Sequence, residues 1–246
     1  RIWLLFNYLS VGELGGAIVI LFTIAATIGI FLAVVYSQSI KAEIPLSFGR
    51  IRGYGIRWPL NFFYTSNIPV ILTAALLANM QLLSTLSKIP WLQGIANWVH
   101  PPTVLGEGII IMLWRGTLTL TSIMQSLVYT LFMVGGSVLF AVFWVKTAGM
   151  DARSQAKNIM SSGLQIPGFR RDERILEAIL NRYIMPLTGM GGIAVCLLAA
   201  GADLLGALVR GTGILLAVMI VYKLYEEIAH QHALDMHPAL KKMIEK

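Results

Sequence analysis

The chain has 246 residues, of which 57% are hydrophobic and only 13% are charged, and its formal net charge is +7. A soluble domain carries about 25% charged residues, so this composition excludes an ordinary water-exposed surface. The single cysteine, Cys196, excludes an internal disulfide and a cysteine-based metal cluster, and its apolar neighbours predict a buried side chain. The class that remains is an all-α membrane protein.

Five segments are apolar over the roughly 20 residues that a membrane span requires. They cover residues 15–36, 60–86, 117–145, 183–202 and 204–225. Residues 1–14 precede them and are too short to span. Because the chain starts at Arg1, we expect this stretch to be an outer loop or the end of a preceding segment of a longer protein.

A polar interruption lies early in the second predicted span, where Asn67 and Pro69 follow Thr65 and Ser66. Proline removes one backbone hydrogen bond from a helix, so the sequence predicts a kink near residues 65–67. Two interpretations remain open here. In the first, neighbouring helices supply partners for the backbone groups that the kink leaves unpaired. In the second, the polar side chains form a contact surface on a helix that moves.

Lysine and arginine are distributed unevenly between the two sides of the predicted spans. One side carries fifteen: Lys41, Arg50, Arg52, Arg57, Lys146, Arg153, Lys157, Arg170, Arg171, Arg174, Arg182, Lys223, Lys241, Lys242 and Lys246. The other carries four: Arg1, Lys88, Arg115 and Arg210. Basic loops stay in the cytoplasm, so loops 37–59 and 146–182 and the tail 226–246 are expected there, and 87–116 outside. The chain is then a multi-pass protein of the cell membrane with a cytoplasmic C-terminus.

Aromatic residues near the predicted helix ends agree with this arrangement. Trp58, Trp91, Trp114 and Trp144 fall where an interfacial tryptophan belt is expected.

The two predicted inner loops are rich in arginine. Arg50 and Arg52 lie in the first, and Arg170 and Arg171 in the second. The general tendency of basic loops to remain in the cytoplasm explains these arginines without any binding partner. The second loop is long, however, and residues 172–184 have apolar side chains at helical spacing, so it is expected to be partly structured. Guanidinium groups on a structured loop suit phosphate backbones.

Catalytic and metal chemistry find little support. No Asp, Glu, Lys, Arg or His lies in the middle of any predicted span, and no nucleophile–base pair or carboxylate pair stands out. His230, His232 and His237 lie in the polar tail without an acidic cluster to complete a metal site. Gly189, Gly191 and Gly192 lie within an apolar span, which indicates helix packing rather than a phosphate loop. We expect no enzyme, no cofactor and no metal.

Several stretches, in their order and spacing, resemble the SecY family of protein translocation channels in its archaeal form. They are Ala42-Glu43-Ile44-Pro45-Leu46, Gly49-Arg50-Ile51-Arg52-Gly53, Thr65-Ser66-Asn67-Ile68-Pro69-Val70-Ile71-Leu72, Phe143-Trp144-Val145, Gly149-Met150-Asp151, Gly168-Phe169-Arg170, Gly211-Thr212-Gly213-Ile214-Leu215-Leu216 and His237-Pro238-Ala239. The resemblance runs from about residue 15 to the end. Residues 87–116 are the least similar part.

The resemblance implies spans six to ten of a ten-helix channel built as an inverted repeat. It implies that Ile71 and Leu216 belong to the apolar pore ring, which resists wetting. Thr65, Ser66 and Asn67 would belong to the lateral gate, and Arg50, Arg52, Arg170 and Arg171 would dock the ribosome.

Implied partners are SecE, the small beta subunit, the ribosome, nascent polypeptides with their signal sequences, the lipid bilayer and the N-terminal half of the channel. Two other functions were weighed, half of a secondary transporter and a packing subunit of a membrane complex. A transporter would need charged groups at the membrane midplane, which the predicted spans lack. A packing subunit would not require large arginine-bearing loops.

Overall fold

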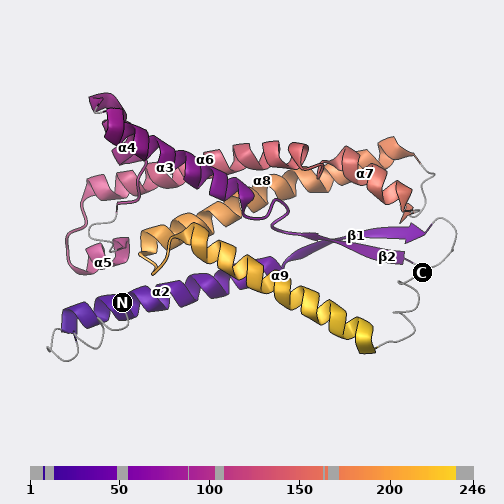
Figure 1. Cartoon of the computed structure of the whole chain (residues 1–246), viewed down its shortest axis with the longest axis horizontal. Helices are drawn as coiled ribbons and strands as arrows, with labels where there is room; N and C mark the ends of the chain where they lie inside the picture. The colour runs from indigo at the N-terminus through magenta and orange to yellow at the C-terminus, as the bar shows by residue number, and fades with distance from the viewer. Residues whose placement is uncertain are drawn as a thin grey trace.

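The computed structural model describes residues 8, 14–48, 55–87, 89–102, 108–162, 164–165 and 172–236. Figure 1 shows a helical bundle with the β1–β2 hairpin and α7 at one end and α4 and α5 at the other. The elements are α2 (Leu14–Ser39), β1 (Lys41–Phe48), β2 (Gly55–Asn61), α3 (Ile68–Ser87), α4 (Pro90–Trp98), α5 (Ile109–Trp114), α6 (Leu120–Thr147), α7 (Ala152–Ser161), β3 (Leu164–Gln165), α8 (Glu173–Leu205) and α9 (Gly211–Met236).

Four of the described helices, α2, α3, α6 and α8, are long and apolar enough to cross a membrane. The prediction of a mostly helical membrane protein is therefore confirmed. The predicted fifth span, residues 204–225, differs from the structure. Residues 206–210 form a turn, and α9 begins at Gly211. Its first 18 residues already include Lys223, Glu226 and Glu227, so only its first half is free of charge.

The second predicted span also begins later than expected. Helix α3 starts at Ile68 rather than near Leu60, and Pro69 is its second residue. Backbone N–H groups in the first turn of a helix have no hydrogen-bond partner within the helix, so proline, which has no N–H, is tolerated there. Pro69 therefore lies at the start of this helix and does not kink it. The residues assigned to the beginning of the span belong to β2 and to the turn that follows.

A small sheet corrects the expectation of an all-α fold. Strand β1 pairs with β2 in antiparallel register, from Lys41 opposite Asn61 to Ser47 opposite Gly55. On its other edge β1 pairs with β3, with Phe48 opposite Leu164. Loop 37–59 is thus mostly a hairpin, and β3 from loop 146–182 completes a sheet in the order β2-β1-β3.

Helix α8 connects two separate hydrophobic cores. Its first half packs Leu176, Leu180 and Ile184 against the sheet and α7. Its second half, with residues such as Val195 and Cys196, packs within the bundle of long helices. The 33 residues of α8 extend about 50 Å at 1.5 Å per residue. The helix, which contains Pro186, therefore joins the sheet end of the molecule to the bundle, and the expected loop–span boundary near residue 183 falls within one continuous helix.

Candidate functional site

Ile71 on α3 and Leu216 on α9 are apolar side chains that point out of the helical bundle. Their exposed fractions are 37% and 45%, whereas the preceding residues, Val70 and Leu215, are 1% and 0% exposed. One residue of each pair anchors its helix in the core, and the next is presented at the surface of the described chain. This arrangement leaves both side chains available to an apolar constriction.

A contact between the turn before α3 and helix α9 relates the depths of these two side chains. The Ser66 hydroxyl lies 3.5 Å from the sulfur of Met219. Helix α3 runs from the hairpin toward α4, whereas α9 runs toward the hairpin (Figure 1). Leu216 precedes Met219 by three residues, just under one helical turn, and Ile71 follows Ser66 by five residues. Both therefore lie on the α4 side of the same contact, within roughly a helical turn of each other in depth.

The polar residues before α3 are mostly buried within this bundle. Thr65 is 1% exposed and Asn67 is 4% exposed. Their side-chain polar atoms, Thr65 Oγ1 and both amide atoms of Asn67, have no hydrogen-bond partner among the described residues. A buried polar group without a partner costs about 1–3 kcal/mol. Ser66 between them has a φ of 58°, a left-handed conformation that is uncommon outside glycine.

Close packing holds this irregular segment in place. A Cβ on Gly191 of α8 would lie 2.7 Å from the carbonyl oxygen of Phe62, so only glycine allows α8 to approach the backbone here. Gly192 faces α6, where the Ser137 hydroxyl donates a 3.0 Å hydrogen bond to its carbonyl. The predicted helix–helix packing is confirmed for Gly192, whereas Gly191 packs against the turn after β2 and Gly189 has open space at its Cβ position.

The four predicted docking arginines, Arg50, Arg52, Arg170 and Arg171, lie outside the described residues, and so does His237. The strands next to them are described. Residues 49–54 join β1 to β2, and residues 166–171 follow β3, which pairs with the end of β1. The two basic segments therefore leave from one small sheet, a relationship that the sequence analysis missed.

Two contacts tie the sheet, and the turn that follows β2, to other parts of the bundle. Lys41 at the start of β1 forms an ion pair with Glu226 on α9, and this hydrogen bond raises the pKa of Lys41. The Tyr64 hydroxyl donates a 2.6 Å hydrogen bond to the carbonyl of Met150 after α6, and burial raises the pKa of Tyr64 to about 12.

The turn after α6 is fixed by a helix cap. Asp151 accepts a hydrogen bond from the backbone N–H of Ser154 at the start of α7. Hydrogen bonding from the Ser154 side chain, more than from its backbone N–H, lowers the pKa of Asp151.

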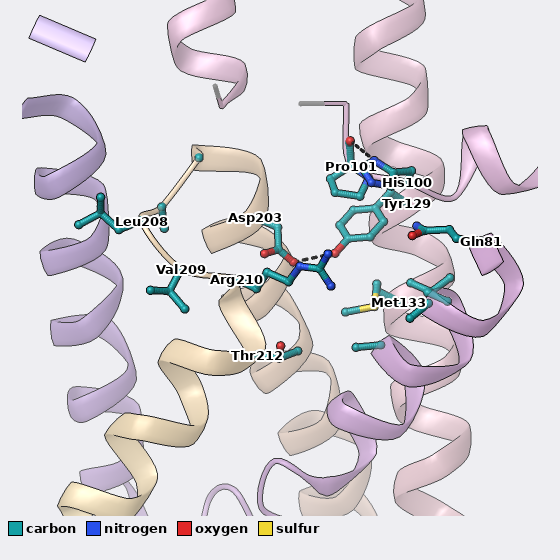
Figure 2. Close-up of a pocket in the computed structure, with 15 residues that line it drawn as sticks. Gln81, His100, Pro101, Tyr129, Met133, Asp203, Leu208, Val209, Arg210 and Thr212 are labelled. Carbon is teal, nitrogen blue, oxygen red and sulfur yellow. Dashed lines mark hydrogen bonds between the residues drawn. The ribbon is translucent and has the colours of Figure 1, made fainter. Parts of the chain in front are cut away.

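A cavity of about 390 Å³ lies between α3, α6 and the start of α9. Figure 2 shows Tyr129, Asp203 and Arg210 close together on its wall. Tyr129 donates a 2.8 Å hydrogen bond to Asp203 Oδ2, and Asp203 Oδ1 accepts one of 2.8 Å from the N–H of Gly211. In the sequence analysis Asp203 falls between the predicted spans 183–202 and 204–225, and no role was assigned to it. An acidic side chain at the end of an apolar span was the signal that a partner should be sought.

The sequence and the architecture of the chain are similar to those of known proteins. The SecY family model matches residues 2–225. The chain is 41% identical to the protein translocase subunit SecY of Methanococcus vannielii, across 100% of this chain and 56% of that protein. It is 43% identical to the corresponding subunit of Pyrococcus furiosus, across 93% and 49%. A solved structure described as that of a protein conducting channel has a TM-score of 0.74 and 38% identity, across 97% and 55%. The chain therefore spans about half the length of the relatives it matches.

Proposed function

The chain belongs to the SecY family, and on that premise we propose that it forms the C-terminal half, spans six to ten, of a protein-conducting channel. The complete channel would have ten helices in an inverted repeat. It would move unfolded polypeptides across the cell membrane and release hydrophobic segments sideways into lipid. The names of the relatives favour this function over half of a secondary transporter.

The paired exposure of Ile71 and Leu216 carries this proposal. Two large apolar side chains at similar depth, on helices whose adjacent residues are buried, suit one side of an apolar ring. Such a constriction dewets, so it blocks ions when no polypeptide occupies it. The N-terminal half of the channel would supply the opposite side. The process requires no bond-breaking step in this chain.

The lateral gate is proposed to involve α3 and α6, with Thr65, Ser66 and Asn67 as its polar patch. The burial of Thr65 and Asn67 changes the way in which these residues would act. Instead of presenting a polar surface, they form a costly polar break at the foot of α3. If α3 moved so that the polar atoms of Thr65 and Asn67 gained hydrogen-bond partners, the cost of burying them would be relieved. The polar break would in this way favour movement of α3 and contribute to gating.

The basic segments on the small sheet are proposed to dock the ribosome. Arg50, Arg52, Arg170 and Arg171 would contact phosphate groups, for which the planar guanidinium is well suited. On this proposal the sheet and the C-terminus would lie in the cytoplasm. SecE and the small beta subunit are proposed as the membrane partners, and signal sequences as ligands of the gate.

Crosslinking to an arrested secretory polypeptide tests the pore assignment. A photoreactive residue at position 71 or 216 of the complete channel should crosslink to the polypeptide. The matched control is Leu83, an exposed leucine near the far end of α3. Crosslinking at 83 equal to that at 71 and 216, or absence of crosslinks at 71 and 216, would exclude a shared pore ring.

A further inference from the structure

Helix α4, which follows the outer end of α3 and precedes α5, has three distinct faces. Ala96 and Val99 are 5% and 6% exposed and pack onto the protein. Trp91, Ile95 and Trp98 follow the i, i+4, i+7 pattern of one helix face and are 66%, 45% and 46% exposed. A third face carries the exposed polar residues Gln93 and Asn97. The helix thus presents an aromatic, apolar stripe that no described part of the chain covers.

We propose that this stripe, Trp91, Ile95 and Trp98, inserts into the outer interface of the lipid bilayer and anchors the end of α3 there. The proposal rests on the assignment of α3 as a membrane span and concerns a stretch in which the family resemblance is weakest.

The length of α3 sets the depth of α4. Its 20 residues extend about 30 Å, the thickness of the hydrocarbon core. Only residues 88 and 89 separate its last residue from Pro90. Pro90 is the first residue of α4, after Ile89 in an extended conformation, so the chain changes direction at this point. Helix α4 therefore begins at the outer end of α3, beyond the turn at residues 206–210 that lines the same cavity as residues 74–81 of α3, as an interfacial segment would.

The chemistry of the surface favours lipid over water or a charged partner. Leu82, Leu83 and Leu86, near the end of α3, are 62%, 59% and 78% exposed, so the apolar surface of the span continues directly into α4. Residues 89–106 contain no Asp, Glu, Lys or Arg. Tryptophan is the residue that prefers the membrane interface, because its ring is apolar and its N–H is polar.

A hydrogen-bonded clamp fixes α4 relative to α6. The side-chain N–H₂ of Gln125 donates to the carbonyl oxygens of Asn97 at 2.6 Å and His100 at 3.1 Å. One side chain on α6 thereby holds the C-terminal end of α4, while the chain itself joins the other end to α3. Insertion of α4 into the interface would restrain the outer ends of both helices, the pair that we assign to the gate.

Site-specific fluorescence of the complete channel in lipid vesicles tests the anchor. Cys196 is fully buried and is first replaced by alanine. A cysteine is then introduced at Ile95 or Trp98 on the stripe, or at Gln93 on the polar face as the control, and labelled with an environment-sensitive dye. Nitroxide lipids should quench the dye at positions 95 and 98. Iodide dissolved in the water should quench the dye at these two positions several-fold less than the dye at position 93.

Two results would overturn the proposal. Equal iodide quenching at 93, 95 and 98 means that the stripe faces water. Protection at 95 and 98 from both iodide and nitroxide lipids means that another protein surface, such as the other half of the channel, covers it. A label-free measurement guards against misfolded variants. Brominated lipids should quench a smaller share of the tryptophan fluorescence in the Trp91→Phe, Trp98→Phe variant than in the parent, and an unchanged share contradicts contact with lipid. Failure of the polypeptide crosslinks at 71 and 216 would leave this outcome unaffected.

Discussion

The Tyr129 hydroxyl on α6 donates a 2.8 Å hydrogen bond to the carboxylate of Asp203 at the end of α8. The second oxygen of the same carboxylate accepts the N–H of Gly211, the first residue of α9. One acidic side chain (Figure 2) therefore joins three helices, toward the end of the bundle opposite the sheet (Figure 1).

Removal of this junction should destabilise the bundle. A hydrogen bond to a charged group contributes about 1.5–3 kcal/mol, so we expect Tyr129→Phe to lower the free energy of unfolding by about 2 kcal/mol. Asp203→Ala should cost more, because it leaves both the tyrosine hydroxyl and the Gly211 N–H without a partner. Tyr225→Phe is the control, since Tyr225 is 70% exposed. Thermal unfolding in detergent measures all three, and equal stability of Tyr129→Phe and Tyr225→Phe would contradict the argument.

The sequence predicted the long helices well and the sheet not at all. Hydropathy reports burial in lipid directly, so α2, α3, α6 and α8 were recognised as spans. The sheet was hidden because loops 37–59 and 146–182 were interpreted by their charge. The signal was present: Ala42, Ile44, Leu46 and Phe48 alternate with Lys41, Glu43, Pro45 and Ser47, the period of a half-buried strand. The pairing of β1 with β3 links distant segments, which local patterns do not reveal.

The candidate site was predictable in part. The identities of Ile71 and Leu216 came from the family resemblance, and their exposure beside buried neighbours is a property of the packed helices. The polar run 65–67 was recognised as a break, but its position before the helix instead of within it depends on how β2 ends. Only Trp91 of the stripe on α4 was recognised, as part of the expected interfacial belt, because a nine-residue helix is too short for a hydropathy window.

Polar substitution in the proposed ring should make the idle channel leak. Asparagine at position 71 or 216 gives water a hydrogen-bonding partner inside the constriction, so wetting becomes easier. We expect Ile71→Asn and Leu216→Asn each to increase ion conductance of the idle channel in planar bilayers. Leu72→Asn is the matched control, because Leu72 is the next residue on α3 and is 40% exposed. A leak of similar size from Leu72→Asn would reject the assignment of a specific ring.

Asn67 offers a test of the gate with an unusual sign. Its amide is buried without a partner in the described chain, so Asn67→Leu should leave stability unchanged or raise it, whereas most core substitutions lower it. The same change should alter the signal-sequence hydrophobicity that opens the gate, measured by translocation of substrates with graded signals. Thr73→Val is the control, since its hydroxyl bonds only to Pro69 in its own helix. Unchanged acceptance of weak and strong signals would make Asn67 only part of the turn.

The Lys41–Glu226 ion pair should contribute little at neutral pH. Both side chains are partly exposed, at 30% and 48%, and exposed pairs are worth about 0.2–1 kcal/mol. A double-mutant cycle with Lys41→Met and Glu226→Gln should give a coupling energy in that range. The raised pKa of Lys41 means that this stability is present below about pH 10 and is lost as the pH rises through the folded value. A coupling that persists after lysine deprotonation would contradict an ionic origin.

Arg170 is expected to contact the ribosome specifically, because Gly168 and Phe169 precede it in the longer basic segment. Phosphate contact releases condensed counterions and therefore depends on salt. Arg170→Glu should weaken ribosome binding more at low salt than at high salt. Membrane insertion and folding should remain nearly intact, since the residue lies outside the long helices.

The competing explanation treats Arg170 as one of fifteen interchangeable positive charges that only set orientation. Arg174 provides the matched control, because it lies four residues further along, in the exposed first turn of α8. If charge alone matters, Arg174→Glu should weaken binding as much as Arg170→Glu. If Arg170 reaches phosphate from the segment after β3, its substitution should cause the larger loss and the larger fall in salt dependence. Co-sedimentation of both variants with ribosomes decides between these outcomes, and equal losses, or none, would reject a specific docking role for Arg170.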